Sequence, residues 1–332
     1  MTGLAATFRA LAHEIAMRSA VLGRPVDIDV ASVADRTGML DLKPPGLWSP
    51  NRSCRLVRAA DGWIAVNLPR ETDREMVPAW LEADVDAGWP TIIRIVRERP
   101  WRGLVDQARL LALPIAGVGE VSADRPDAVL ERRAAGARRS GPLNVIDLSS
   151  MWAGPLCGGV LAAMGASVTK LESRGRPDPT RLTMPALHAR LNGGKSLGDF
   201  DPGDRGDVAR LGEAMATADV VITGARPRAF QQMGLTPDVL FAANPGLVWV
   251  AISGYGWTSE ASDRVAFGDD AAAAGGLVRR ARGQPRFLGD ALADPITGLA
   301  AAAGAMRALQ EGGGFLVDAA LARCAAGAAR AA

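Results

Sequence analysis

Acidic residues gather in the C-terminal third of the sequence. Asp269 and Asp270 are adjacent, and Asp290 and Asp294 follow further along the chain. Asp294 stands directly before Pro295 in the segment ALADPITGL, a pattern typical of the first turn of a helix. An aspartate at that point commonly caps the helix. Alternatively, backbone N–H groups at the helix start would help the same carboxylate act as a nucleophile on an acyl group. The residue types by themselves leave both interpretations open.

Basic side chains follow a predicted strand at residues 168–173. They are Arg174, Arg176, Arg181, Arg190 and Lys195. Loops after parallel strands meet at the carboxyl edge of a sheet, where ligands bind. Arginine pairs with phosphate in a bidentate way and lysine acts as a point charge, so this group is suited to a polyphosphate. The alternative is that these are solvated loop charges.

Small residues follow the predicted strand at 145–148. Gly154 and Pro155 come first, and Gly158 and Gly159 follow on the expected helix, where backbone N–H groups can approach a phosphate. The pattern is not the G-x-G-x-x-G of dinucleotide-binding folds, so no nicotinamide cofactor (NAD) is expected even though Glu172 ends the next strand. The glycines alternatively serve only close packing of helix and strand.

Other reactive residue types give weaker signals. His13 and His188 are the only histidines and have no G-x-S-x-G segment beside them, so a hydrolase triad has little support. The three cysteines are far apart, which argues against disulfides and a zinc site, and no metal is expected. Cys157 is interpreted as a packing residue. A basic stretch is interpreted as a solvated helix face, with contact to an anionic ligand as the lesser alternative; it contains Arg94, Arg97, Arg99 and Arg102.

Composition limits the classes of partner. The 332 residues are 48% hydrophobic and carry a net charge of +2, enough for a sizeable core but not for a field that would hold nucleic acid or an acidic membrane. Charged residues interrupt the first twenty positions, and no spanning apolar segment occurs elsewhere. We therefore expect a protein of the reducing cytoplasm that binds neither nucleic acid nor membrane.

The hydrophobic pattern predicts an α/β fold with four parts. Residues 1–24 form a helix that packs on the large domain, 25–125 a small α+β domain, 126–142 a linker, and 143–332 a large Rossmann-like domain with a parallel sheet. Within the small domain, residues 54–68 predict a hairpin that turns at Asp61 and Gly62, followed by three helices. In the large domain strands and helices alternate, which is typical of a helix-covered parallel sheet.

Six segments, in order, resemble the family III CoA-transferases, a family that also contains the α-methylacyl-CoA racemases. The first is VIDLSSMWAGPLCGGVLAAMGASVTKLES at 145–173. The others are RPDPTR at 176–181, LNGGKS at 191–196, ADVVITGARPRAFQQMGL at 218–235, NPGLVWVAISGYG at 244–256 and ALADPITGLAAAAGAMRAL at 291–309. The resemblance implies coenzyme A (CoA) as a substrate, bound by a Rossmann-like domain.

The resemblance also implies roles for individual residues. Asp294 takes the position of the family's covalent catalyst, whose carboxylate attacks an acyl-CoA thioester and carries CoA as an aspartyl thioester to an acceptor carboxylic acid. Contacts to CoA carry over to Arg181, Lys195 and Arg226, and the backbone at Gly154 and Pro155 is a further candidate.

Two departures from the family pattern keep alternatives open. Racemases have a His-Asp pair where this chain has Asp269 and Asp270, so a racemase or epimerase would use Asp269 as one base and Asp294 as the other. The segment before Arg226 is Gly224-Ala225, where the family often has Asn-Phe, which leaves a non-catalytic CoA-binding subunit as another hypothesis. A homodimer or a companion subunit is expected.

The order of the domains also departs from the family. Residues 53–73 resemble the hairpin of the family's small domain, which follows the large domain in ordinary members but precedes it here. The chain is therefore interpreted as circularly permuted.

Overall fold

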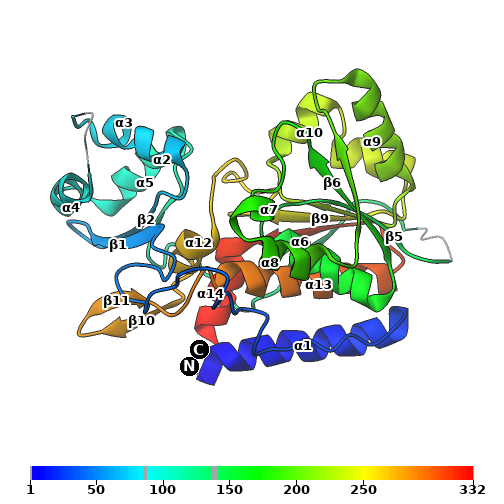
Figure 1. Ribbon diagram of the computed structural model, residues 1–332, viewed down its shortest axis with the longest axis horizontal. Coiled ribbons are helices and arrows are strands. Elements are labelled where there is room, and N and C mark those ends of the chain that lie inside the picture. Colours follow the sequence, from blue (N-terminus) through cyan, green and yellow to red (C-terminus); the bar gives the residue numbers. More distant parts are fainter. Residues whose placement is uncertain (1, 85–87, 137–140, 332) are drawn as a thin grey trace.

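The computed structural model describes residues 2–84, 88–136 and 141–331. Among these residues one large sheet has the strand order β4-β12-β9-β8-β5-β6-β7 (Figure 1). Its strands are β4 (Val129–Arg132), β5 (Asn144–Leu148), β6 (Ser167–Ser173), β7 (Ser196–Phe200), β8 (Val220–Thr223), β9 (Val248–Ser253) and β12 (Phe315–Ala320). All neighbours pair in parallel except β4, which is antiparallel to β12. The predicted α/β class with a parallel sheet is confirmed.

The strand order reverses between β5 and β8. From β5 the chain adds β6 and β7 on one side, and then β8, β9 and β12 on the other. This is the doubly wound order of nucleotide-binding folds, in which ligands bind outside the carboxyl ends of the strands at the reversal point. The loops that start after Leu148 and Thr223 therefore define the expected ligand crevice.

Helices cover both faces of the sheet. Alternate residues of β9 point to opposite faces: Val248 and Val250 belong to a core with α6 and α13, and Trp249 and Ala251 to a core with α9, α10 and α11. The helices of the large domain are α6 (Ala153–Met164), α7 (Thr180–Thr183), α8 (Pro185–Asn192), α9 (Arg205–Thr217), α10 (Pro227–Met233), α11 (Pro237–Ala243), α12 (Gly268–Ala274), α13 (Ala293–Gln310) and α14 (Leu321–Arg330). Strands buried on both faces explain the continuous apolar runs in the sequence.

Helix α13 lies at the centre of one layer, between α6, α14 and α1 (Thr2–Leu22) (Figure 1). Its alanines and glycines are buried all around the helix, which lets neighbouring backbones come close. A Cβ on Gly298 would lie 2.7 Å from the carbonyl oxygen of Ala153, so the second turn of α13 is in direct contact with the start of α6. Phe8, Leu11 and Ile15 of α1 join the same core.

A second, smaller unit has its own core. The strands β1 (Cys54–Arg58), β2 (Trp63–Asn67) and β3 (Ile115–Gly117) form an antiparallel sheet in that order. The helices α2 (Glu71–Glu75), α3 (Val77–Leu81), α4 (Trp89–Glu98) and α5 (Trp101–Leu110) lie beside it (Figure 1). The predicted hairpin over residues 54–68 is confirmed by the pairing of β1 with β2.

Two predicted boundaries are wrong. The segment 126–142, predicted as a linker, contributes β4 to the large sheet, because main-chain pairing with β12 at a sheet edge requires few apolar side chains. Residues 137–140 of that segment lie outside the described residues. The predicted small domain began at residue 25, but Val26 and Val33 are buried in the core of the large domain. The separate core of the small unit starts only at Val57.

The sequence interpretation also missed a hairpin that projects from the large domain. It consists of β10 (Val278–Ala281) and β11 (Gln284–Phe287), which pair in antiparallel fashion. Phe287 packs with Cys54 and Leu56, so this hairpin lies against the strand β1 of the small unit. Among the described helices, none combines the length and the apolar character that crossing a membrane requires.

Candidate active site

Asp294 lies in the first turn of α13, against the start of α12. A Cβ on Gly268 would overlap Oδ2 of Asp294 and the carbonyl oxygen of Ala291, so a glycine is required for the two helix starts to come this close. The N–H of Gly268 donates a hydrogen bond to the Asp294 carboxylate. The turn before it contains Ala291 at φ +46°, a conformation that is strained for a residue with a side chain. Asp294 is half-buried and keeps access to solvent.

The surroundings of Asp294 raise the pKa of its carboxyl group toward neutral pH. Burial raises the pKa of Asp294 to about 7, the charge of Arg36 lowers it, and the charges of Asp269 and Asp290 raise it. A carboxylate in this state is less stabilised by solvent than an exposed one, yet ionised to a large extent near neutral pH. That is the balance expected of a carboxylate nucleophile.

A polar network joins the groups around Asp294. Arg36 donates to Asp290 (Nε to Oδ2, 2.6 Å), and Asn51 Nδ2 donates both to Oδ1 of Asp290 (2.9 Å) and to Oδ2 of Asp269 (2.7 Å). The other oxygen of Asp269 accepts from the N–H of Ala291 at 2.8 Å. Burial and the charge of Asp290 raise the pKa of Asp269 to about 6. Both oxygens of Asp269 are thus used within the protein.

Asp270 points to the small unit instead. Its Oδ1 accepts from Asn67 Nδ2 at 2.6 Å and from the N–H of Phe267 at 3.0 Å. Its Oδ2 is buried without a hydrogen-bond partner among the described residues. Burial raises the pKa of Asp270 to about 8. Asp270 therefore ties α12 to β2, and the network around Asp294 does not include it.

The structure brings the predicted backbone site at Gly154 and Pro155 to the same end of the molecule. The guanidinium of Arg36 lies 4.6 Å above the ring of Trp152, the residue before α6, while also binding Asp290. The start of α6 also borders the expected ligand crevice, because α6 follows the loop after β5. Arg36 thus links the helix start that is suited to a phosphate with the carboxylates around Asp294.

Lys195 has an internal role. Its Nζ is fully buried and donates to Oδ2 of Asp147 (2.7 Å), the carbonyl oxygen of Pro155 (2.8 Å) and Oδ1 of Asn192 (2.8 Å). These contacts use all three donors of the ammonium group. Burial lowers the pKa of Lys195, and the charge of Asp147 opposes this. Lys195 holds the first turn of α6 on β5 and has no donor left for a ligand.

The two predicted arginines lie at the carboxyl edge of the sheet. Arg181 donates to Glu172 (Nε to Oε2, 3.1 Å), and its side chain is 41% exposed. Arg226 precedes α10, directly after β8. Burial lowers the pKa of Arg226, the positive charges of Arg228, Arg70 and Arg176 lower it further, and the charge of Asp263 opposes this.

These four arginines, Arg70, Arg176, Arg226 and Arg228, form a basic cluster at the crevice. Sequence reasoning missed Arg70 and Arg228. The signal for Arg228 was its place two residues after Arg226; Arg70 comes from the small unit and had no signal. Arg70 is already paired with Asp73 (Nη2 to Oδ1, 2.5 Å), and the remaining positive charge favours an anionic ligand.

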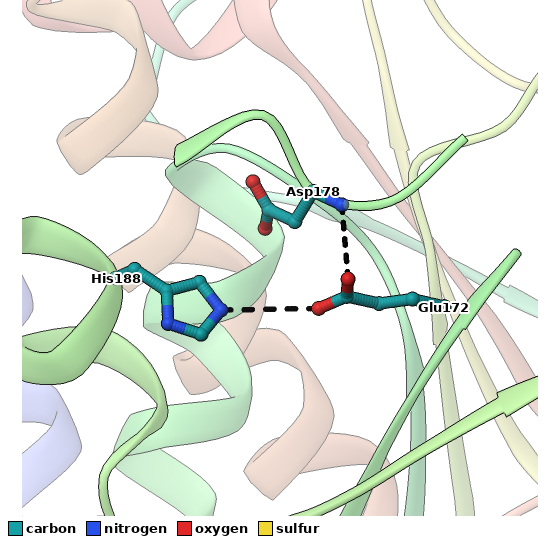
Figure 2. Close-up of side chains that lie close together, drawn as sticks. All are labelled: Glu172, Asp178 and His188. Carbon is teal, nitrogen blue, oxygen red and sulfur yellow. Dashed lines mark hydrogen bonds and ion pairs between the residues drawn. The ribbon is translucent and has the colours of Figure 1, made fainter. Parts of the chain in front are cut away.

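Figure 2 shows a buried group of side chains behind this edge. Oε1 of Glu172 lies 3.8 Å from Nε2 of His188, and Oε2 accepts from the N–H of Asp178 at 3.0 Å. The three side chains come close enough to hold a metal ion. However, the fully buried Nζ of Lys170 lies 3.2 Å from Oδ2 of Asp178 and 3.8 Å from Oε1 of Glu172. The charge of Lys170 already compensates these carboxylates, and a metal would have to compete with it.

Comparison with known proteins identifies the family of this chain. The model of "CoA-transferase family III" matches residues 142–330. A succinyl-CoA–D-citramalate CoA-transferase of Chloroflexus aurantiacus is 33% identical over 195 residues, which cover 53% of this chain and 47% of that protein. The alpha subunit of a succinyl-CoA–L-malate CoA-transferase from the same organism is 34% identical over 193 residues, covering 53% and 45%.

A solved structure gives the same assignment for the fold. A CAIB/BAIF family protein from Brucella suis superimposes with a TM-score of 0.52 and 29% identity, covering 58% of this chain and 55% of that one. The fold that contains the doubly wound sheet is therefore that of a CAIB/BAIF family protein. The chain belongs to CoA-transferase family III. It spans about half the length of the relatives it matches.

Proposed function

We propose that this chain transfers CoA from an acyl-CoA thioester to a carboxylic acid, with Asp294 as the nucleophile. The observation that carries the proposal is the environment of Asp294: its side chain is largely buried but reaches solvent, it accepts from the N–H of Gly268, and burial raises its pKa to about 7. Among Asp269, Asp270 and Asp294, only Asp294 keeps access to solvent, because the other two are buried.

The reaction would proceed by four acyl transfers. The carboxylate of Asp294 attacks the thioester carbonyl, which expels CoA thiolate and leaves a mixed anhydride. The thiolate attacks the aspartyl carbonyl, which releases the donor acid and forms aspartyl-CoA. The acceptor carboxylate then attacks this thioester, and the second mixed anhydride is opened by CoA thiolate at the acceptor carbonyl. Asp294 is regenerated as a carboxylate.

The chain's own residues suggest how the charges would be held. The basic cluster of Arg70, Arg176, Arg226 and Arg228 would bind the phosphates of CoA at the crevice, with Arg181 beside it. The start of α6 at Gly154 and Pro155 would offer backbone N–H groups. Lys195 would contribute by positioning that helix start, since its own donors are used.

Short dicarboxylic acids are the substrates to try first. The relatives' names include succinyl-CoA, D-citramalate, L-malate and glutarate. The names of other relatives include separate alpha and beta subunits, which supports testing the chain with a companion protein as well as alone. A homodimer stays the alternative assembly.

The racemase hypothesis has less support. A second base opposite Asp294 would have to be Asp269, whose two oxygens accept from Asn51 and Ala291. A separate experiment tests the racemase hypothesis, because a racemase exchanges the α-proton of its acyl-CoA with solvent whereas CoA transfer does not. Incubation in heavy water followed by mass analysis of the thioester separates the two activities.

Intact-mass analysis tests the proposal directly. The purified chain is incubated with succinyl-CoA, glutaryl-CoA and acetyl-CoA, and adducts are trapped with hydroxylamine or borohydride and mapped. We expect an adduct on Asp294 that Asp294→Asn abolishes. Asp270→Asn is the matched control, because it changes a buried aspartate of the neighbouring helix that contacts the small unit, and it should keep the adduct. A folded chain that binds CoA without any adduct, alone and with a companion subunit, would refute the transfer proposal.

A further inference from the structure

A cavity of about 430 Å³ lies on the far side of the small unit's first strand. Its walls are the edge of β1, the helix α4 and the turn of the β10–β11 hairpin, which lie next to one another in Figure 1. Its lining residues are Leu47, Arg55, Leu56, Val57, Arg58, Trp63, Ile93, Arg97, Arg282, Gly283 and Gln284. None of the residues discussed around Asp294 or in the basic cluster lines it.

The cavity concentrates positive charge without compensation. Four of its lining residues are arginines, Arg55, Arg58, Arg97 and Arg282, and none is a carboxylate. In the part of the chain that the structure describes, these four form no ion pair and donate no side-chain hydrogen bond to the protein. Positive side chains that line one cavity repel one another, and an anion that enters would relieve this repulsion.

Aromatic rings restrain two of these arginine side chains, Arg55 and Arg58. The guanidinium of Arg55 lies 4.9 Å from the ring of Trp48 and 5.7 Å from that of Trp89, and these two rings pack edge to face. The guanidinium of Arg58 lies 5.9 Å from the ring of Trp63. Burial lowers the pKa of Arg55, which shows that its charge is partly removed from water. An arginine restrained in this way loses little freedom when it binds a ligand.

The backbone adds a donor. The N–H groups of Cys54 and Leu56 point away from β2, since they donate to Ser49 Oγ and to the carbonyl oxygen of Leu47. By strand alternation the N–H of Arg58 points the same way, toward the free edge of β1. The cavity therefore offers guanidinium forks and a strand-edge N–H beside the apolar surfaces of Trp63 and Ile93.

We propose that this cavity binds an organic anion with at least two negative charges and a planar or apolar part, such as a nucleoside phosphate. Two or more charges are needed to balance four arginines, and both phosphate and carboxylate oxygens fit the guanidinium fork. The planar part would lie against Trp63. The volume is within the range of sites for small organic ligands. This site is separate from the proposed CoA crevice and does not depend on the activity of Asp294.

Calorimetric titration with two probes tests the proposal, with ADP as an organic phosphate and citrate as a polycarboxylate without a ring. The double variant Arg97→Gln/Arg282→Gln changes two exposed side chains of the cavity. Arg94→Gln is the matched control, because Arg94 is an exposed arginine of the same helix that does not line the cavity. We expect the double variant to weaken ADP binding at least tenfold and Arg94→Gln to leave it unchanged. Stronger binding of citrate than of ADP, with the same dependence on the double variant, would contradict the planar part of the proposed ligand and indicate a polycarboxylate instead.

ADP also resembles part of CoA, so the crevice is tested separately. In Arg226→Gln the proposed CoA cluster is weakened, and the cavity should still bind ADP with the wild-type affinity. Thermal unfolding of each variant verifies that it is folded. The proposal is overturned if Arg226→Gln abolishes binding of ADP while Arg97→Gln/Arg282→Gln spares it, or if neither probe binds the wild-type chain.

Discussion

The regions around the start of α6 and the start of α13 differ in how their buried charges are balanced. On the β5 side, Asp147 is fully buried and faces Lys195, and Asp178 faces the equally buried Lys170. On the α12 side, Asp269 and Asp294 are surrounded by other carboxylates and share Arg36 as the nearby cation. On the first side each buried carboxylate is paired with a lysine, and Lys195 also holds the backbone at the start of α6. On the second side the carboxylates outnumber the nearby cation.

The difference is visible in the direction of the pKa shifts. Burial tends to raise the pKa of Asp178, but hydrogen bonds from Thr180 and the charge of Lys170 outweigh it, so this pKa is lowered. Burial raises the pKa of Asp294 to about 7, and the single opposing charge of Arg36 does not cancel it. A balanced aspartate stays ionised and inert, whereas an unbalanced one changes protonation near neutral pH and is a better candidate for chemistry.

The largest expected effect comes from removing the unbalanced group itself. Asp294→Asn keeps the size of the side chain and removes the proposed nucleophile, so CoA transfer should fall by about a thousandfold or more. Rates of acyl-CoA formation, measured by chromatography, give the loss, and CoA binding measured by calorimetry should persist. A variant with most of its transfer activity would place the nucleophile elsewhere.

Breaking the balanced pair should instead affect stability. Lys195→Met leaves Asp147 buried without its cation, which costs about 3–5 kcal/mol of unfolding free energy. Denaturant unfolding measures this. Lys43→Met is the control, since the Lys43–Asp41 pair is exposed and contributes about 0–1 kcal/mol. Equal losses of unfolding free energy in the two lysine variants would show that the buried pair is no more important for stability than the exposed one.

Changing the neighbours of Asp294 should move its pH profile in two directions. Transfer activity of the wild-type chain should rise with pH through about 7 as Asp294 loses its proton. Because Arg36 lowers the pKa of Asp294, Arg36→Gln should shift the profile to higher pH, and because Asp290 raises it, Asp290→Asn should shift the profile to lower pH. Profiles of kcat/KM against pH show the shifts, and displacement of both variants in one direction would contradict the assignment.

The last expected effect concerns the pH dependence of stability and involves Asp270, whose pKa burial raises to about 8. The folded state then keeps a proton that the unfolded chain loses near pH 4, so this group makes the protein less stable as pH rises from about 4 to 8. Asp270→Asn should make the fall in unfolding free energy less steep, by about 1.4 kcal/mol per pH unit between pH 5 and 7. Urea unfolding at several pH values measures the slope, and an unchanged slope would show that Asp270 is ionised when folded.

Part of the fold was predictable because its signals are local. The alternation of apolar strands with helices predicted the parallel sheet, and the Asp-Pro step predicted that Asp294 starts a helix. The edge strand β4 was missed, since its pairing with β12 depends on backbone groups that carry no composition signal. The permuted order of the domains stays a prediction.

The site divides in the same way. The sequence by itself determined which residue types stand at the ends of strands and helices: Asp294, the glycine-rich start of α6, and Arg226 after β8. Only the tertiary structure decided how deeply these side chains are buried and which charges lie beside them. It brought Asn51 to Asp269 across 218 residues of sequence, buried Lys195 on Asp147, and left Asp294 with more carboxylates than cations around it. Sequence spacing fixes local geometry, whereas burial and charge balance depend on segments that meet only in the folded chain.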